Sequence, residues 1–428
     1  MEDTQCIQSI LSTIDFEKRI AELEHQIPKA LTNLKSQQNT LSLSKRNQIK
    51  RVWYQKCEVL RIDLQVQIHL HQIETESNST HITSLTKRLD RLHTGLQLDI
   101  VVPSGSIPER LYMLLRMITF LNVFVGWFAA LFLLIPLRFV IPTLRKLGIT
   151  KNYLPADIAS WGMATMMYLS SGVTTSVEGK DVLKHLESPV ICMFSHSSNL
   201  DGILVNKASP VAFKFAAKKS LFMVPFMGWV ARWFLQFVAI DRSNRKSAVQ
   251  SLRALARLVH VEGNSICMSP EGTRSMSGLL QDFKKGPFYL RDEIDKNVVP
   301  AIVFGAYELW PPGLLFALPG KTLVRFLPEF VSDKGKSREL NRLALRKIFL
   351  EASIQDVPDD IGTKATLDAI VANVLVTYLI WYVTIKFSVL SYAFVCGLCG
   401  AIDISFSTFI WFAILVGIAL EVVMFLTC

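Results

Sequence analysis

The chain has 428 residues, of which 50% are apolar and 19% are charged, so it is long enough to bury a large core. A mean hydropathy of +0.32 argues against a wholly soluble protein. The net charge of +10 suits an anionic partner, either nucleic acid or the negatively charged surface of a membrane. The apolar fraction favours the membrane, and no motif for nucleic-acid binding is present.

Residues 1–102 are polar, with apolar side chains at mixed three- and four-residue spacing, which predicts long amphipathic helices. The two stripes are Phe16, Ile20, Leu23, Ile27, Leu31 and Leu34, and Leu85, Leu89, Leu92 and Leu96. They form either a coiled-coil seam, for a helical partner or self-association, or the buried side of a helical hairpin. The lack of a sustained heptad favours the hairpin. Pro28 is expected to kink or end the first helix nearby.

An apolar segment from Met113 to Leu134 is interrupted by one charge, Arg116, and is long enough to cross or dip into a bilayer. We therefore assign residues 113–144 to a membrane-embedded helix or helical hairpin. The basic residues that follow it predict that the next part of the chain is cytosolic. A second apolar stretch, residues 366–427, has room for two or three spans and predicts C-terminal transmembrane helices.

Between these apolar regions, residues 148–335 alternate short apolar strands with helical stretches, as is typical of an α/β domain with a central sheet flanked by helices. Buried strands are expected at Pro189–Phe194, Ser265–Met268 and Val298–Phe304. An amphipathic helix is expected at Ser247–Val261. The predicted fold is thus an α/β domain with an N-terminal all-helical region and C-terminal transmembrane helices.

The sequence Ser-His-Ser-Ser-Asn-Leu-Asp, residues 195–201, follows the first of these strands. On one continuous helix, His196 and Asp201 would point to different sides, so the two pair only if the chain turns between them. A corner from strand to helix supplies that turn, because Ser and Asn favour turns and helix N-termini. Asp201 would then accept a hydrogen bond from one imidazole nitrogen and leave the other to take a proton from an alcohol. The alternative is a capping Asp beside a solvated His.

A second motif, Ser-Pro-Glu-Gly-Thr-Arg-Ser at residues 269–275, follows the strand Ser265–Met268. Gly272 allows close approach of the backbone to a ligand, and Arg274 offers a planar fork of donors that matches phosphate oxygens. Glu271 is placed either to hold that arginine or to bond a glycerol hydroxyl. Lys218 and Arg242 are further cations that, with Arg274, predict a positive pocket for a phosphate headgroup. Taken singly, each is as well explained by a solvated surface.

The ordered set HSSNLD, AKKSLFMVPFMGW, FVAIDR, SPEGTRS, FKKG and VPAIV resembles the 1-acylglycerol-3-phosphate acyltransferase family, whose active site carries a His and an Asp separated by four residues, the HX4D motif. The resemblance covers about residues 171–330. Ser195 stands where the family often has Asn, and Ser269 where an aromatic residue is usual, which bears on substrate preference.

The resemblance implies direct acyl transfer without a covalent enzyme intermediate, a metal or a cofactor, with acyl-CoA or acyl carrier protein as the thioester co-substrate. At the matching positions, His196 would be the general base and Asp201 its orienting partner. The residues implied for the phosphate and glycerol of the acceptor are Glu271, Gly272, Thr273, Arg274, Arg242 and Lys218. Pro300 would help to shape the site beside the acyl chain.

We therefore expect a membrane-bound acyltransferase that acts on the sn-2 hydroxyl of 1-acylglycerol 3-phosphate and gives phosphatidic acid. Its catalytic domain would face the cytosol at the endoplasmic reticulum or a bacterial inner membrane. The alternatives are another acceptor, glycerol 3-phosphate or a different lysophospholipid, a phospholipid transacylase, and a catalytically silent membrane scaffold. A serine hydrolase that uses Ser195, Ser197 or Ser198 is disfavoured because no GxSxG elbow is present.

Overall fold

The structure is a computed structural model, and it divides into two compact units. It describes residues 16–37, 43–71, 76–96, 107–133, 139–147, 154–185, 189–224, 227–241, 245–333, 335–363 and 365, and isolated positions beyond 365. The helical unit comprises residues 1–101, 275–285 and 332–357. The α/β unit comprises residues 102–274, 286–331 and 358–428.

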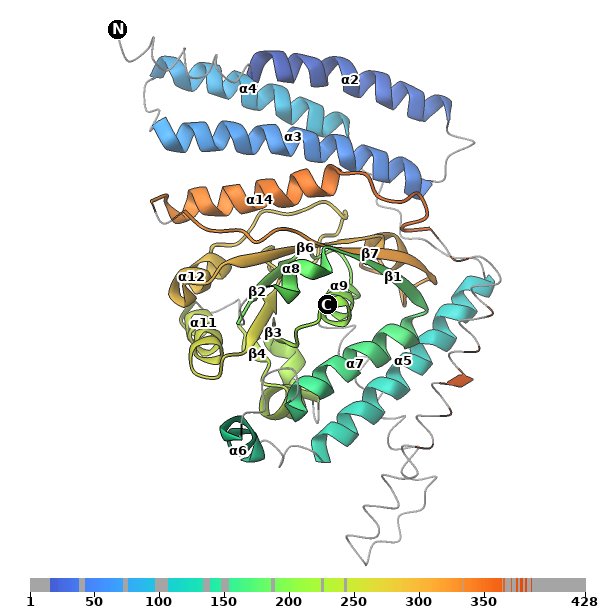
Figure 1. Cartoon of the computed structure of the whole chain (residues 1–428). Coiled ribbons are helices and arrows are strands. Elements are labelled where there is room, and N and C mark those ends of the chain that lie inside the picture. The colour runs from blue at the N-terminus through green and yellow to red at the C-terminus, as the bar shows by residue number, and fades with distance from the viewer. Residues whose placement is uncertain are drawn as a thin grey trace, which may run out of the picture. The chain divides into compact units, whose positions relative to one another are not determined.

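The helical unit contains α2 (Phe16–Ser36), α3 (Leu43–His71), α4 (Glu76–Gly95) and α14 (Arg338–Ile354). Figure 1 shows α2, α3 and α4 alongside one another, with α14 beside α3. Most side chains of the two predicted stripes are buried in one cluster within this unit, and Leu23, Leu31 and Leu92 pack against it. Leu34 is also buried. These helices therefore fold on one another, as the hairpin interpretation predicted, and the apolar stripes supply the core of the unit.

Pro28 was predicted to kink or end the first helix, and the second alternative is wrong, because α2 runs through Pro28 to Ser36. Proline costs a helix interior one hydrogen bond and crowds the preceding turn. Burial of Ile20, Ile27 and Leu34 along the same face spans both sides of the proline. This tertiary packing holds the helix together where the local preference would interrupt it.

The thiol of Cys57 on α3 lies in the core of the helical unit and is fully buried. Burial raises the pKa of Cys57 to about 12, because the apolar surroundings disfavour the thiolate. Since only the thiolate is a good nucleophile, we expect iodoacetamide at pH 8 to leave Cys57 unmodified in the folded protein and to alkylate it in urea. Peptide mass spectrometry measures this, and rapid alkylation of Cys57 in the native protein would contradict the packing of α3.

The α/β unit is built around a seven-stranded sheet of order β1-β7-β6-β2-β5-β3-β4. The strands are β1 (Val173–Glu178), β2 (Ile191–Phe194), β3 (Phe213–Lys218), β4 (Val238–Ile240), β5 (Ser265–Met268), β6 (Val298–Phe304) and β7 (Gly320–Phe326). Neighbours pair in parallel except for β6 and β7, which are antiparallel. The carboxyl ends of β2, β5 and β3 therefore share one edge of the sheet.

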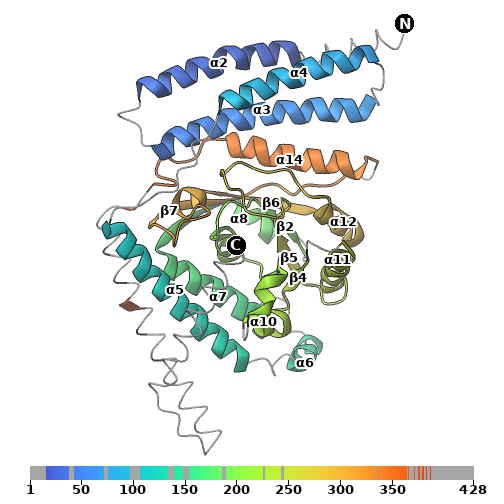
Figure 2. The same cartoon turned by 180° about the vertical axis from the view of Figure 1, so that it is seen from behind.

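The helices of this unit are α5 (Ile107–Leu133), α6 (Ile141–Lys146), α7 (Pro155–Ser171), α8 (Lys180–Lys184), α9 (Asp201–Ala208), η2 (Lys219–Met223), α10 (Met227–Trp229), η3 (Val230–Phe234), α11 (Arg245–His260), α12 (Lys285–Ile294) and α13 (Ala306–Leu309). Leu204, Val205 and Ala208 of α9 pack with the inner strands in one buried cluster. In both views α7 and α5 lie side by side (Figures 1 and 2).

The predicted strands and the amphipathic helix are confirmed, with β2, β5, β6 and α11 at the expected places. The residues of the three strands are almost wholly apolar, and β2 and β5 are buried at every position, as inner strands of a parallel sheet require. The predicted α/β class is therefore confirmed. Helices α5 and α6 cover most of the segment assigned to residues 113–144.

Within the described residues, however, none of the helices has both the length and the apolar character needed for a membrane crossing. The structure thus gives no support to a spanning helix at residues 113–134. The transmembrane helices predicted for residues 366–427 lie outside the described residues, apart from isolated positions.

Candidate active site

The motif at residues 195–201 forms a corner between β2 and α9, as the sequence predicts. Directly after β2, the N–H of Ser195 donates to Ala301 O at 3.1 Å, and its Oγ accepts from Val303 N, also at 3.1 Å. These two bonds hold the end of β2 against β6. Helix α9 starts at Asp201, which places its carboxylate at the first turn, where backbone N–H groups are free.

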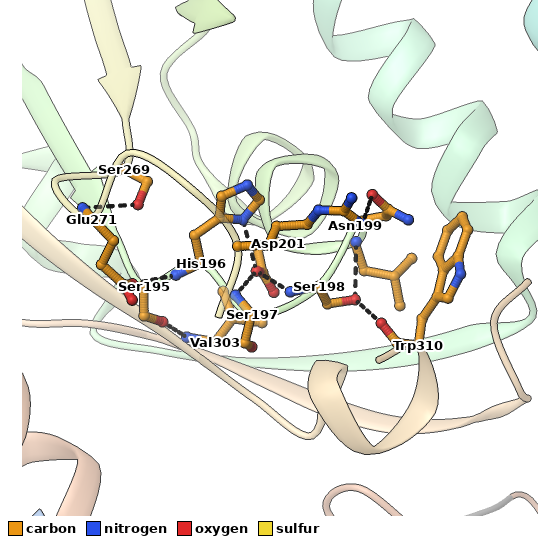
Figure 3. Close-up of polar contacts among 12 residues, drawn as sticks. Ser195, His196, Ser197, Ser198, Asn199, Asp201, Ser269, Glu271, Val303 and Trp310 are labelled. Carbon is orange, nitrogen blue, oxygen red and sulfur yellow. Dashed lines mark hydrogen bonds and ion pairs between the residues drawn. The ribbon is translucent and has the colours of Figure 1, made fainter. Parts of the chain in front are cut away.

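The corner brings His196 and Asp201 together (Figure 3). Asp201 Oδ2 lies 3.1 Å from His196 Nδ1 and also accepts the N–H groups of Ser197 at 2.6 Å and Ser198 at 2.7 Å. Asp201 is fully buried, whereas the imidazole is 26% exposed. The carboxylate therefore anchors the turn and the imidazole together, and leaves one part of the ring open to an incoming molecule.

This geometry selects the tautomer of the histidine. A carboxylate can only accept, so Nδ1 carries the proton that it shares with Asp201, and the lone pair is on Nε2. Figure 3 shows this second ring nitrogen on the side away from Asp201. A neutral imidazole with an oriented lone pair is the group that general-base catalysis requires.

Glu271 lies behind the corner and supports its backbone. Its Oε1 accepts the N–H of His196 at 2.7 Å, and the residue is 1% exposed. The turn that carries it is closed by Ser269, whose Oγ accepts from Glu271 N at 3.2 Å and whose carbonyl accepts from Gly272 N at 3.3 Å. Gly272 has φ +77°, a conformation in which only glycine is unstrained. One carboxylate oxygen of Glu271 thus bonds the backbone of the motif, a use that the sequence did not indicate.

Arg274 is held beside the same motif. Its Nη1 donates to Asn199 Oδ1 at 2.6 Å, so the motifs after β2 and β5 are joined side chain to side chain. Asn199 was not predicted as a site residue. The available signal was its position inside the His-to-Asp spacing, at an exposed point of the turn. The two roles predicted for Glu271, to hold Arg274 or to bond a glycerol hydroxyl, stay predictions.

The structure describes three of the four remaining predicted residues. Lys218 is the last residue of β3 and is exposed at the sheet edge that carries His196, and Thr273 is exposed beside Arg274. Pro300 is buried within β6, opposite Met193 of β2, and its carbonyl accepts from Leu327 N at 2.9 Å. Arg242 lies outside the described residues. The roles assigned to these residues stay predictions.

Two of the three serines near His196 have other hydrogen-bond partners. Ser195 Oγ accepts from Val303 N, and Ser198 Oγ donates to Trp310 O at 3.0 Å and accepts from Leu200 N at 3.2 Å. A serine nucleophile needs its Oγ within hydrogen-bond reach of the histidine nitrogen that takes the proton. These bonds direct both hydroxyls to the backbone and disfavour the hydrolase alternative.

The family model described as "Acyltransferase" matches residues 174–303, which contain both motifs. A 1-acyl-sn-glycerol-3-phosphate acyltransferase of Limnanthes douglasii is 30% identical over 38% of this chain and 56% of its own length. The enzyme of the same name from Saccharomyces cerevisiae is 31% identical over 44% of this chain and 63% of its own length. A crystal structure of the acyltransferase PlsC from Thermotoga maritima aligns with 59% of this chain and 100% of that chain, at 20% identity and a TM-score of 0.46.

Residues 174–303 are therefore similar to the acyltransferase family over the stretch that contains both motifs. The predicted resemblance to the 1-acylglycerol-3-phosphate acyltransferase family is confirmed by relatives that carry this name. The chain spans somewhat over half the length of these two relatives.

Proposed function

We propose that this protein transfers a fatty acyl group from an acyl thioester, on CoA or acyl carrier protein, to the sn-2 hydroxyl of 1-acylglycerol 3-phosphate and gives phosphatidic acid. The observation that carries the proposal is the His196–Asp201 pair, 3.1 Å apart at the corner after β2, with Arg274 tied to the same corner through Asn199. A general base and a phosphate-binding cation are thereby presented together. The names of the relatives support this choice of acceptor.

In the proposed reaction, Nε2 of neutral His196 takes the proton of the acceptor hydroxyl as its oxygen attacks the thioester carbonyl. The new C–O bond forms, and the C–S bond then breaks. The thiolate leaves and receives the proton from the imidazolium, which returns His196 to its starting state. Buried Asp201 stabilises the imidazolium while it exists. No metal or cofactor takes part in this scheme, because the imidazole and the thioester supply the base and the activated acyl group.

Arg274 is the residue that we assign to the acceptor phosphate, with Lys218, Thr273 and Arg242 as further groups at this headgroup. An arginine matches phosphate oxygens with two parallel donors and keeps its charge at any physiological pH. Arg274 donates from one guanidinium nitrogen, Nη1, to Asn199, and this bond sets the direction of the guanidinium. The same chemistry would accept glycerol 3-phosphate or another lysophospholipid, and a transacylase would draw its acyl group from a phospholipid instead of a thioester.

We also propose that the protein works at a membrane, on the cytosolic side of the endoplasmic reticulum or of a bacterial inner membrane. Leu111, Leu114, Leu115 and Ile118 are exposed and recur at the spacing of one face of α5. Exposed leucines in such a row favour burial among lipid acyl chains. The net charge of +10 adds attraction to anionic lipids.

The Arg274→Ala variant tests the assignment of the phosphate. We expect its KM for 1-acylglycerol 3-phosphate to rise by about tenfold to a hundredfold, the range for losing a charge-assisted hydrogen bond to phosphate. The KM for acyl-CoA should stay unchanged. Arg253→Ala, which removes an exposed arginine from α11, is the matched control and should behave as wild type. An Arg274→Ala effect confined to the acyl donor would show that the phosphate is bound elsewhere.

A panel of acceptors distinguishes the alternatives. Purified protein is incubated with labelled acyl-CoA and, in separate reactions, 1-acylglycerol 3-phosphate, glycerol 3-phosphate and lysophospholipids with larger headgroups. The proposal predicts the highest kcat/KM for 1-acylglycerol 3-phosphate. Transfer from a labelled phospholipid in the absence of any thioester would instead establish a transacylase.

A further inference from the structure

The segment Ser275–Lys285 starts directly after Arg274 yet packs within the helical unit. Its neighbours there come from α14, more than fifty residues further along the chain. The loop Ser269–Arg274, which carries Glu271 and Arg274, therefore continues without a break into a segment that the helical unit holds. The chain passes from one unit to the other at the Arg274–Ser275 peptide bond, so the end of the loop is covalently joined to a segment that the helical unit fixes.

Two arginines of α14 bind the backbone of this segment. Arg346 Nε donates to Gln281 O at 3.3 Å, and its Nη2 lies 3.3 Å from Asp282 Oδ1. Arg342 Nη1 donates to Phe283 O at 2.9 Å. The ring of Phe283 is buried and meets Phe349 of α14 edge-on, with ring centroids 5.2 Å apart. The segment is thus fixed by polar and apolar contacts at three consecutive residues.

Arg346 has a second partner, Glu58 of α3, which fixes its guanidinium in turn. Arg346 Nη2 donates to Glu58 Oε2 at 2.6 Å, and the side chains are 5% and 7% exposed. A buried guanidinium is costly unless a carboxylate and hydrogen-bond acceptors surround it. The planar fork meets that requirement by using Nη2 for the carboxylate and Nε for the carbonyl of Gln281. Arg346 therefore connects α3 to the segment that follows Arg274.

We propose that Arg346, held by Glu58, is a positioning residue for acyl transfer: it restrains residues 281–283 and thereby limits where Arg274 can lie. The assignment rests on the proposed function for the role of Arg274 at the acceptor phosphate. It also gives the N-terminal helices a task in the reaction, because Glu58 of α3 helps to fix the segment that follows Arg274 in the chain. Small displacements of a binding group weaken a productive complex strongly, because precise geometry must then be restored on binding.

Arg346→Met and Lys347→Met form a matched pair that tests this role. Lys347 is the next residue of α14 and also pairs with α3, through Asp63, while its other ion pair is with Glu351. We expect Arg346→Met to raise the KM for 1-acylglycerol 3-phosphate by about tenfold and to leave kcat and the KM for acyl-CoA within about twofold. Lys347→Met should leave all three within about twofold of wild type. An unchanged acceptor KM in Arg346→Met, or an equal rise in Lys347→Met, would overturn the proposal.

Amide hydrogen exchange on the full-length protein gives a readout that does not depend on activity. Exchange in residues 269–283 should be faster in Arg346→Met than in wild type and unchanged in Lys347→Met. Glu58→Gln, which keeps the side-chain volume and removes the charge, should act in the same direction with a smaller effect. If wild type fails to acylate 1-acylglycerol 3-phosphate, the proposed function fails, and exchange still decides the link between Arg346 and the loop. If residues 269–274 exchange at the wild-type rate in both Arg346→Met and Glu58→Gln, the proposed role of Arg346 is overturned.

Discussion

The His196→Ala variant is expected to lose acyl transfer, with kcat reduced by about a thousandfold, within the range that a positioned general base contributes. The side chain supplies the only nitrogen in the His196–Asp201 pair that can take the hydroxyl proton, because Nδ1 already shares its proton with Asp201. The substitution leaves the backbone N–H of His196 in place to bond Glu271. The fold of the protein, and the membrane association proposed for it, should therefore be retained.

His185→Ala is the matched control for this experiment. His185 is an exposed histidine after α8 in the same unit. Its backbone N–H donates to the carbonyl of Asp181, and the substitution keeps this bond. Initial rates with 1-acylglycerol 3-phosphate and acyl-CoA, together with thermal unfolding of each variant, separate loss of catalysis from loss of structure. A folded His196→Ala protein with a rate within tenfold of wild type would show that His196 is not the general base.

Two substitutions at Asp201 should differ in a way that separates its structural and catalytic roles. Asp201→Ala leaves the part-buried N–H of Ser197 and the buried N–H of Ser198 without their acceptor and should lower the free energy of unfolding by about 2 to 4 kcal/mol. Asp201→Asn keeps an oxygen for those two donors and should retain most of the stability. Both variants should lose kcat by about a hundredfold or more, because neither has the negative charge that stabilises the imidazolium.

Denaturant unfolding and steady-state kinetics on the same preparations measure the two effects. Wild-type kcat in a stable Asp201→Asn protein would show that the carboxylate serves the turn alone. Equal destabilisation by both substitutions would show that the charge, and not the acceptor oxygen, holds residues 197 and 198.

Much of the site could be predicted because its features are local. A strand of four buried apolar residues, followed by Ser and Asn and then a helical run, requires a corner at residues 195–200. A corner there brings a His and an Asp five positions apart within reach of each other. The apolar runs of β5 and β6 were equally clear, since inner strands of a parallel sheet are buried on both faces.

The features that could not be predicted depend on contacts between distant parts of the chain. Glu271 accepts the backbone N–H of His196, and a sequence pattern of side chains does not indicate a backbone partner. Glu58 and Arg346 are 288 positions apart, so nothing in the local sequence of α3 or α14 indicates their ion pair. The same is true of residues 275–285, whose packing in the helical unit follows from the position of α14. Pro28 failed as a helix terminator because burial on both sides of it outweighs the local cost.

The most direct test is to identify the product formed by the purified full-length protein from 1-acylglycerol 3-phosphate and an acyl-CoA with an isotopically labelled chain. Mass spectrometry should show phosphatidic acid with the label at the sn-2 position and release of one CoA per acyl group, and the His196→Ala protein should give neither. Phosphatidic acid at the same rate from His196→Ala, or free labelled fatty acid as the sole product of wild type, would contradict direct transfer by an imidazole base.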